Sequence, residues 1–156
     1  MIQAARSGVQ NIAEGSQASG TSKKTELRLT NVARASWEEL RLDYEDFLRQ
    51  RGLKIMAPDD AVLKRFKATK CATLRQFQEW VAEERRRSVS VKVSESRCES
   101  VSSCELAANG ALSLLNLCCW LLDKQLKAQA SAFEKEGGFT ERLYRVRSSM
   151  RRAHTD

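Results

Sequence analysis

Apolar and polar residues follow one another along most of this chain with the period of an α-helix. Apolar side chains recur every three or four residues, which places them on one helix face that packs against a core. The pattern predicts helices over 23–51, 60–87, 104–136 and 140–152, preceded by one that starts near residue 2. Proline occurs once and glycine seven times, so few breakers interrupt the pattern. We therefore predict an all-α fold, an antiparallel helical bundle with a C-terminal helical extension.

Two irregularities are predicted from single residues. An apolar face runs from Ile2 to Ile12, and we expect Gly15 to end this helix in the left-handed conformation that glycine adopts readily. In the helix over 60–87, Lys70 falls on the apolar face. An irregular turn is therefore expected close to that lysine.

The segment 88–103 has a different pattern. Val89, Val91 and Val93 alternate with polar residues, as they would in a strand. A lone strand has no partner in an otherwise helical chain. We therefore interpret 88–103 as a Ser-rich linker.

The helix predicted over 104–136 is the most apolar of the chain. Between Leu112 and Leu122 apolar side chains lie nearly all round it, so we expect two or more neighbouring helices to cover it. The apolar run 111–122 is shorter than the roughly 20 residues that cross a bilayer, and Asn116 interrupts it. This run predicts a buried helix and no membrane span.

The chain is basic, with a formal net charge of +7. Residues 64–97 contain ten Lys or Arg against four Glu, and residues 135–152 contain six against two. Such a surplus favours a polyanion, with nucleic acid as the main candidate, although a solvated basic surface is the alternative. The candidate phosphate-binding residues, which could form one surface, are Arg85, Arg86, Arg87, Arg142, Arg145, Arg151 and Arg152. In the last helix we expect Leu143, Val146 and Met150 to face inward.

The sequence contains few residues of the kinds that catalysis or metal binding needs. The only histidine is His154, and the five cysteines lack the Cys-x-x-Cys spacing of a zinc site. The stretch 15–20 lacks the Lys-Ser/Thr ending of a phosphate-binding loop. We predict a protein without catalytic function, metal or cofactor. The first residues lack the pattern of a secretory signal, which favours a cytoplasmic protein with reduced thiols.

Short motifs in two parts of the chain resemble one known family. They include NIAEGS at 11–16, a Lys-Lys-x-Glu start at 23–26, and ARAS followed by Glu-Leu within 33–40. Together these residues resemble the four-helix-bundle family named after the intervening sequences of bacterial 23S ribosomal RNA genes. The accessory variability determinant of diversity-generating retroelements is similar to that family. Residues 108–109 and 137–145 resemble the suffix extension that some members carry.

The resemblance implies a domain organisation and partners. It divides the chain into a four-helix-bundle-like domain at 1–87, the linker at 88–103, and a helical suffix at 104–156 that packs on the bundle. Family members carry a further helix before the NIAEG motif, so we expect the first helix of the bundle to be absent here. The resemblance also implies a homo-oligomer, a pentamer in characterised relatives, whose repeated basic faces would add avidity.

Five residues of the motifs are candidates for a site. They are Asn11, Glu14, Gly15, Arg34 and Ser36. In our main interpretation they are structural: Asn11 and Glu14 satisfy backbone groups near a helix end, and Ser36 allows a close helix approach. In the alternative, the Asn11–Glu14 pair lies beside Arg34 and holds a ligand or a neighbouring subunit.

Two functions remain open from the sequence. One is an accessory protein that binds nucleic acid, RNA in preference to DNA, through contacts of Lys and Arg with phosphates. The other is a protein-interaction or scaffold module, for example a partner of a reverse transcriptase, without direct nucleic-acid binding. We expect Trp37, Trp80 and Trp120 to be core or interface anchors rather than platforms for stacked bases.

Overall fold

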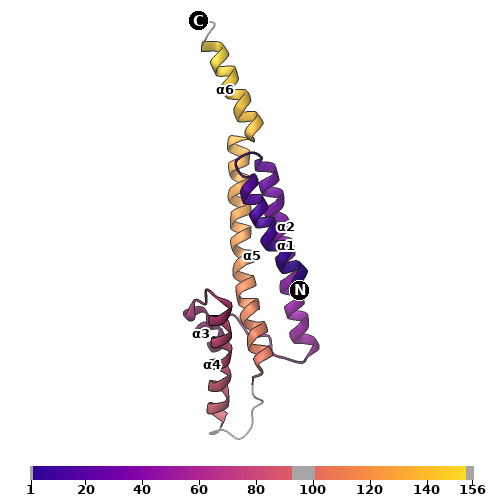
Figure 1. Ribbon diagram of the computed structural model, residues 1–156, viewed down its shortest axis with the longest axis vertical. Coiled ribbons are helices and arrows are strands. Elements are labelled where there is room, and N and C mark those ends of the chain that lie inside the picture. Colours follow the sequence, from indigo (N-terminus) through magenta and orange to yellow (C-terminus); the bar gives the residue numbers. More distant parts are fainter. Residues whose placement is uncertain (1, 93–100, 154–156) are drawn as a thin grey trace. The chain divides into compact units, whose positions relative to one another are not determined.

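The computed structural model of the chain describes residues 2–92 and 101–153 (Figure 1). The described residues are 84% helical and include no strand, which confirms the all-α prediction. The helices are α1 (Ile2–Ala18), α2 (Lys23–Gln50), α3 (Ala61–Thr69), α4 (Leu74–Lys92), α5 (Ser103–Glu136) and α6 (Phe139–Ala153).

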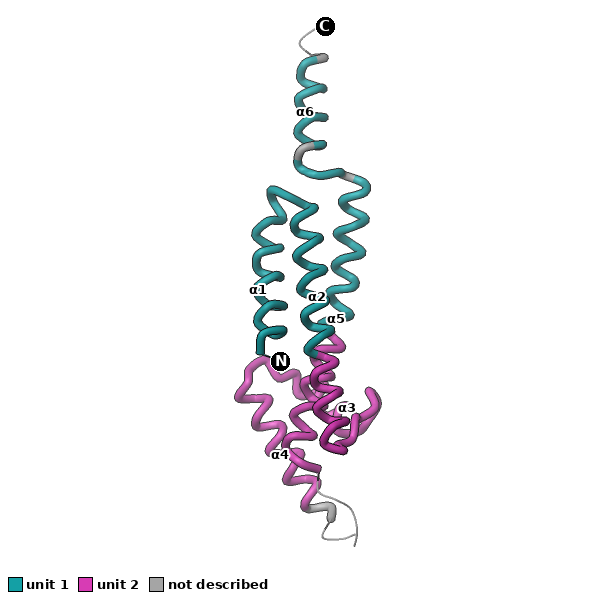
Figure 2. The backbone as a smooth tube through the Cα atoms, turned by 90° about the vertical axis from the view of Figure 1, so that its right-hand side faces the viewer, with its two compact units in different colours: residues 1–40, 118–156 teal, residues 41–117 magenta. Residues whose placement is uncertain are grey.

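The helices belong to two compact units (Figure 2). Unit 1 comprises residues 1–40 and 118–156, and unit 2 comprises residues 41–117. The boundaries fall within α2 and α5, so each unit contains one part of each of these long helices. The units therefore differ from the intervals 1–87 and 104–156 that the family resemblance suggests.

In unit 1, α1 and α2 pack closely because small residues of α1 face α2. A Cβ atom on Gly8 would lie 1.5 Å from Nε1 of Trp37, so a larger side chain cannot occupy this position without a shift of the indole. A Cβ atom on the buried Gly15 would lie 3.3 Å from Cβ of Leu29. These two glycines set how near the two helices can approach.

The prediction that Gly15 ends the first helix is wrong. α1 continues to Ala18, and the turn to α2 follows, where Ser22 Oγ accepts a hydrogen bond from the Thr25 N–H. A glycine near the end of an apolar pattern can terminate a helix or permit a close contact. Burial against α2 gives Gly15 the second role.

Polar side chains connect α2 to α5 within unit 1. Arg34 Nε donates a hydrogen bond to Asp123 Oδ1, and this bond with the charge of Asp123 raises the pKa of Arg34 above its usual value. Gln129 Nε2 donates to Glu26 Oε1 at 3.0 Å. Both members of the Arg34–Asp123 pair are partly exposed, so the pair orients the helices more than it stabilises them.

In unit 2 the third predicted helix is divided into α3 and α4. Lys70 follows α3 with φ 47° and ψ 49°, the left-handed conformation, which confirms the irregular turn expected close to this residue. The break lets α4 pack against α3 through aromatic side chains. The ring centroid of Phe66 lies 5.6 Å from that of Phe77 and 4.5 Å from that of Trp80.

A buried amide, that of Asn109 on α5, holds the irregular chain between α2 and α3. Its Oδ1 accepts a hydrogen bond from the Met56 N–H at 2.8 Å. Its Nδ2 donates to the carbonyl oxygens of Lys54 at 2.8 Å and Glu105 at 2.9 Å. The side chain is 1% exposed, so these bonds replace contacts with water. Beside it lies a core of Met56, Leu63, Phe66, Trp80 and Leu106.

The Ser-rich linker predicted over 88–103 is wrong at its start, whereas its end agrees with the structure to within one residue. α4 continues to Lys92, and α5 begins at Ser103. Val89 and Val91 are therefore helical, and their alternation with polar residues does not indicate a strand. The rest of the predicted linker, residues 93–100, lies outside the described residues.

Only one side of the middle of α5 is covered. The buried residues are Leu112, Leu115, Cys119 and Leu122. Those that are 42–52% exposed are Leu114, Leu117, Trp120 and Leu121. The expectation that neighbours cover this helix all round is therefore wrong for the described part of the chain. By length and composition alone Ser103–Lys135 could cross a membrane, but 44% of its apolar window is buried, and a core helix meets the same criterion.

We expect Asn109→Ala to lower the free energy of unfolding, because it leaves the buried Met56 N–H without its partner and removes the part-buried hydrogen bond to the Lys54 carbonyl. A buried group left without a partner costs about 1–3 kcal/mol. Urea unfolding followed by circular dichroism measures the effect. Asn116→Ala is the matched control, since Asn116 is exposed on the same helix, and should change the value by less than about 0.5 kcal/mol. Equal effects of the two substitutions would show that the Asn109 bonds do not stabilise unit 2.

Candidate nucleic-acid interface

The arginines predicted to bind phosphate lie on two helices of different units. The α4 arginines, in unit 2, are Arg85, Arg86 and Arg87. The predicted α6 arginines, in unit 1, are Arg142, Arg145, Arg151 and Arg152, and a fifth arginine, Arg147, lies on the same helix. A single phosphate-binding surface formed by both groups stays a prediction.

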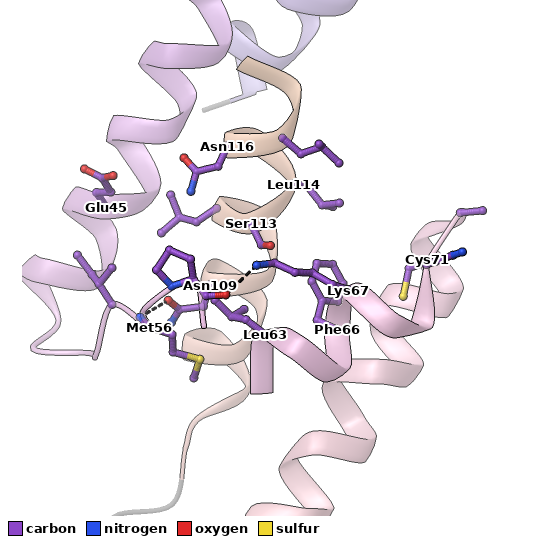
Figure 3. Close-up of a pocket in the computed structure, with 16 residues that line it drawn as sticks. Glu45, Met56, Leu63, Phe66, Lys67, Cys71, Asn109, Ser113, Leu114 and Asn116 are labelled. Atoms are coloured by element: carbon purple, nitrogen blue, oxygen red, sulfur yellow. Dashed lines mark hydrogen bonds between the residues drawn. The ribbon is translucent and has the colours of Figure 1, made fainter. Parts of the chain in front are cut away.

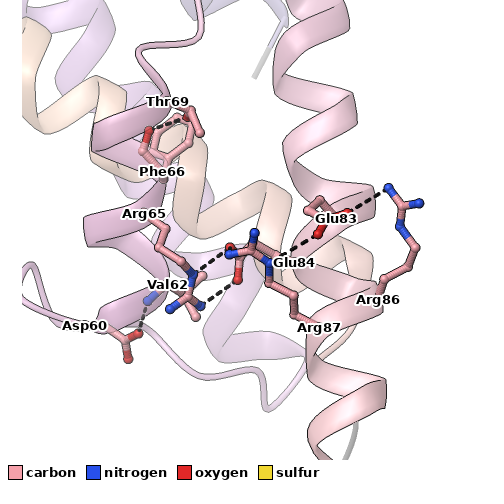
Figure 4. A network of polar contacts seen from close by, with 9 residues as sticks. All are labelled: Asp60, Val62, Arg65, Phe66, Thr69, Glu83, Glu84, Arg86 and Arg87. Carbon is pink, nitrogen blue, oxygen red and sulfur yellow. Dashed lines mark hydrogen bonds and ion pairs between the residues drawn. The ribbon is translucent and has the colours of Figure 1, made fainter.

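The α4 arginines are exposed, but nearby side chains already bind them (Figure 4). Arg86 Nη2 lies 2.9 Å from Glu83 Oε2, and Arg87 Nε lies 3.2 Å from Glu83 Oε1. Arg85 Nη1 donates to Ser103 Oγ at 3.2 Å. Two of the three guanidinium groups therefore have a carboxylate partner on their own helix, which reduces the positive potential that they present.

Glu84, next to these residues, belongs to a structural network. Arg65 of α3 donates two hydrogen bonds to its carboxylate, Nε to Oε1 at 2.7 Å and Nη2 to Oε2 at 2.6 Å. Arg87 Nη1 lies 3.5 Å from the same carboxylate (Figure 4). The Glu84 side chain is 3% exposed, and its hydrogen bonds raise the pKa of Arg65. This two-pronged pair fixes α3 against α4.

The α6 arginines have a larger charge surplus. α6 contains five arginines and one acidic residue, Glu141, whereas α4 contains five basic and three acidic residues. Arg142, Arg145, Arg147 and Arg151 are exposed, and Arg152 lies near the C-terminal end of the helix. At 100° per residue, Arg142, Arg145 and Arg152 share one flank. Cations near the end of a helix also complement its dipole, so part of this pattern has a structural reason.

The apolar stripe of α6 does not face inward as expected. Leu143 is 37% exposed, Val146 50% and Met150 62%. Phe139, which continues the stripe by one helical turn, is 50% exposed. The sequence pattern identified the stripe correctly, but no other described part of the chain covers it.

The motif residues are mainly engaged in helix packing. Asn11 Nδ2 donates to the Ser7 carbonyl oxygen at 2.8 Å, and the hydroxyl oxygens of Ser7 and Ser36 are 2.9 Å apart. Glu14 is exposed and accepts a hydrogen bond from Gln10 Nε2 at 3.0 Å. These contacts, with Gly15 against α2, support the structural interpretation of Asn11, Gly15 and Ser36.

The alternative, a site that Asn11, Glu14 and Arg34 form together, stays a prediction. Arg34 pairs with Asp123 of α5. Asn11 and Glu14 line a hollow of about 430 Å³. All of its lining residues belong to α1, so no second element encloses a ligand there.

The described residues do not bring metal ligands together. They contain no group of three or more His, Cys, Asp or Glu side chains that could hold a metal ion. Burial raises the pKa of the Cys118 thiol, which keeps it protonated and weakly nucleophilic. Cys98 and His154 lie outside the described residues.

The partners of the candidate residues cannot be identified from local spacing in the sequence. Asp123 lies 89 positions from Arg34, and no local spacing connects them. The burial of Glu84 could have been predicted from the sequence. It follows Phe77 by seven residues and Trp80 by four, which places it on the same face of α4 as these two aromatic residues. An acidic residue on an apolar face predicts a buried partner, which is Arg65 here.

Comparison with known proteins gives no assignment: the chain matches no protein-family model, no curated protein and no solved structure.

Glu84→Gln should destabilise the fold, because it removes the charge from a buried acceptor of two guanidinium hydrogen bonds. Hydrogen bonds to charged groups contribute about 1.5–3 kcal/mol. Denaturant unfolding measures the decrease in stability, and the exposed Glu79→Gln on the same helix is the control, expected to stay within about 0.5 kcal/mol. If both substitutions leave stability unchanged, the Arg65–Glu84 pair does not hold α3 against α4.

Proposed function

We propose that this protein is a non-catalytic, basic helical-bundle accessory protein that binds nucleic acid, RNA in preference to DNA, as a homo-oligomer. The observation that supports it is the exposed helix α6, with five arginines against one acidic residue. The preference for RNA and the homo-oligomer, a pentamer in characterised relatives, rest on the resemblance to the 23S rRNA intervening-sequence family.

Within this proposal, α6 contributes more to binding than α4. The α4 arginines would have to exchange contacts with Glu83 and Glu84 for contacts with phosphates, and the remaining carboxylates would repel the ligand. On α6 the arginines occupy both flanks of the apolar stripe, and the helix contains one acidic residue, Glu141, against three in α4. An extended polyanion could therefore contact several of them at once.

The mechanism is electrostatic. A cationic side chain that neutralises a phosphate releases condensed counterions, so the logarithm of the binding constant falls with the logarithm of salt concentration by about 0.7 per contact on single strands. Phosphate contacts carry no base information. The proposed protein would bind sequences of different composition with similar affinity.

A second function, a protein-interaction or scaffold module, has support of its own. Apolar side chains remain exposed on α5, at Leu117, Trp120 and Leu121, and on α6, at Val146 and Met150. Exposed apolar surface of this kind marks protein interfaces when it is contiguous. A reverse transcriptase would be one example of such a partner.

The combined substitution of Arg142, Arg145 and Arg151 by Gln should weaken binding to all single-stranded RNA sequences about equally. It should also lower the salt slope by up to about 2, because each phosphate that is no longer neutralised removes about 0.7 from the slope. Fluorescence anisotropy of labelled RNAs of mixed sequence, repeated over a range of salt concentrations, measures both quantities.

The matched control is the substitution of Arg85, Arg86 and Arg87 by Gln. It removes the same charge, but from arginines that Glu83, Glu84 and Ser103 already bind, so its effect on the slope should be smaller. Unchanged affinity and slope in a folded α6 variant would remove α6 from the interface. Equal effects of the two variants would mean that net charge alone drives binding.

A further inference from the structure

Unit 2 contains an apolar cleft that the proposed nucleic-acid binding does not use (Figure 3). Its volume is about 790 Å³, within the range of small-molecule sites. α3, the irregular chain before it and part of α5 form its walls. The floor consists of buried side chains, namely Met56, Leu63, Phe66 and Leu112.

The cleft follows from two features of the local fold. Asn109 holds the chain at Lys54 and Met56 against α5, which forms one end of the cleft. α3 is only nine residues long and ends at Lys70, so Leu114 and Leu117 of α5 remain beside it without cover. The Asn109 amide bonds to backbone groups, so it does not present free polar atoms to the cleft. The floor beside it is therefore almost wholly apolar.

The charge at the cleft is positive. Glu45 lines it, but this carboxylate pairs with Arg41. Lys67 Nζ donates a hydrogen bond of 2.8 Å to a neutral group, the Pro58 carbonyl oxygen. No carboxylate in the described part of the chain pairs with Lys67 or Lys70, which also lines the cleft.

Polar side chains gather on one side of this apolar floor. Figure 3 shows Lys67 reaching from α3 toward α5, where Ser113 and Asn116 lie along the cleft. An ammonium group and a hydroxyl group above a hydrocarbon surface match a ligand with one anionic head and one apolar chain.

We propose that this cleft binds a free single-chain carboxylate, a fatty acid. The hydrocarbon chain would lie against Met56, Leu63, Phe66 and Leu112. The carboxylate would accept hydrogen bonds from Lys67, which exchanges the Pro58 carbonyl for a charged acceptor, and from Ser113. Charge-assisted hydrogen bonds of this kind are shorter and stronger than the neutral one that they replace.

The test uses isothermal titration calorimetry of the full chain with decanoate, below its micelle concentration. We expect saturable binding of one decanoate per chain. Methyl decanoate and decyltrimethylammonium, with uncharged and cationic heads, should bind at least about tenfold more weakly. Absence of saturable decanoate binding would overturn the proposal. Equal binding of all three compounds would overturn it too, and would indicate a surface for an apolar segment of another protein.

Two pairs of variants locate the site. Lys67→Gln should weaken decanoate binding about tenfold and leave that of methyl decanoate unchanged. Lys64→Gln, on the same helix but outside the cleft, is its control and should bind as the unmodified chain does. Ser113→Phe, which fills the cleft, should abolish binding of both compounds, and Ala132→Phe, at an exposed position elsewhere on α5, should not. Similar effects within either pair would contradict the assignment.

This inference is independent of the proposed nucleic-acid binding, because the cleft belongs to unit 2 and the α6 arginines to unit 1. The variant that lacks Arg142, Arg145 and Arg151 should therefore bind decanoate with unchanged affinity. Weaker decanoate binding by that variant would show that decanoate binds to the α6 arginines, which would overturn the cleft as its site.

Discussion

The structure of unit 2 depends on one requirement, that backbone polar groups taken out of water must find partners. The chain between α2 and α3 is not helical, so its backbone groups lack the hydrogen-bond partners that a helix provides. The Asn109 amide supplies two of these partners, by accepting from the Met56 N–H and donating to the Lys54 carbonyl oxygen. Because this segment is held against α5, α3 starts beside that helix. The aromatic core of Phe66 and Trp80 and the apolar cleft both follow from that position.

The sequence predicted the helices well because their apolar period is a local property. It also located the break at Lys70, where a charged residue interrupts an apolar face. It failed where one residue can serve two purposes. Gly15 could end a helix or admit a neighbour, and only the packing of α2 decides between them. The interpretation of Val89 and Val91 was wrong for a similar reason, since a short alternation of apolar and polar residues fits either a strand or the end of a helix.

The candidate interface was predictable in composition but not in its pairing. Counting charges identifies Arg86 and Arg87, yet Glu83 and Glu84 within the same turn determine how much of that charge is available. Arg34 illustrates the same limit over a longer distance, because its partner Asp123 comes from another helix. The capacity to bind a polyanion thus depends on which basic side chains are not already paired with carboxylates of the same chain. By composition α6, with five arginines and one acidic residue, has a larger positive surplus than α4, with five basic and three acidic residues.

The three tryptophans fall into different environments, and this gives the protein separate optical reporters. Trp80 is 5% exposed within the aromatic core of unit 2, whereas Trp37 and Trp120 belong to unit 1, and Trp120 is 51% exposed. An indole in an apolar core emits at shorter wavelength than one in water. Replacing Trp80, or the other two together, would leave the tryptophan fluorescence of one unit only. The opening of each unit could then be followed in the intact chain without an added label.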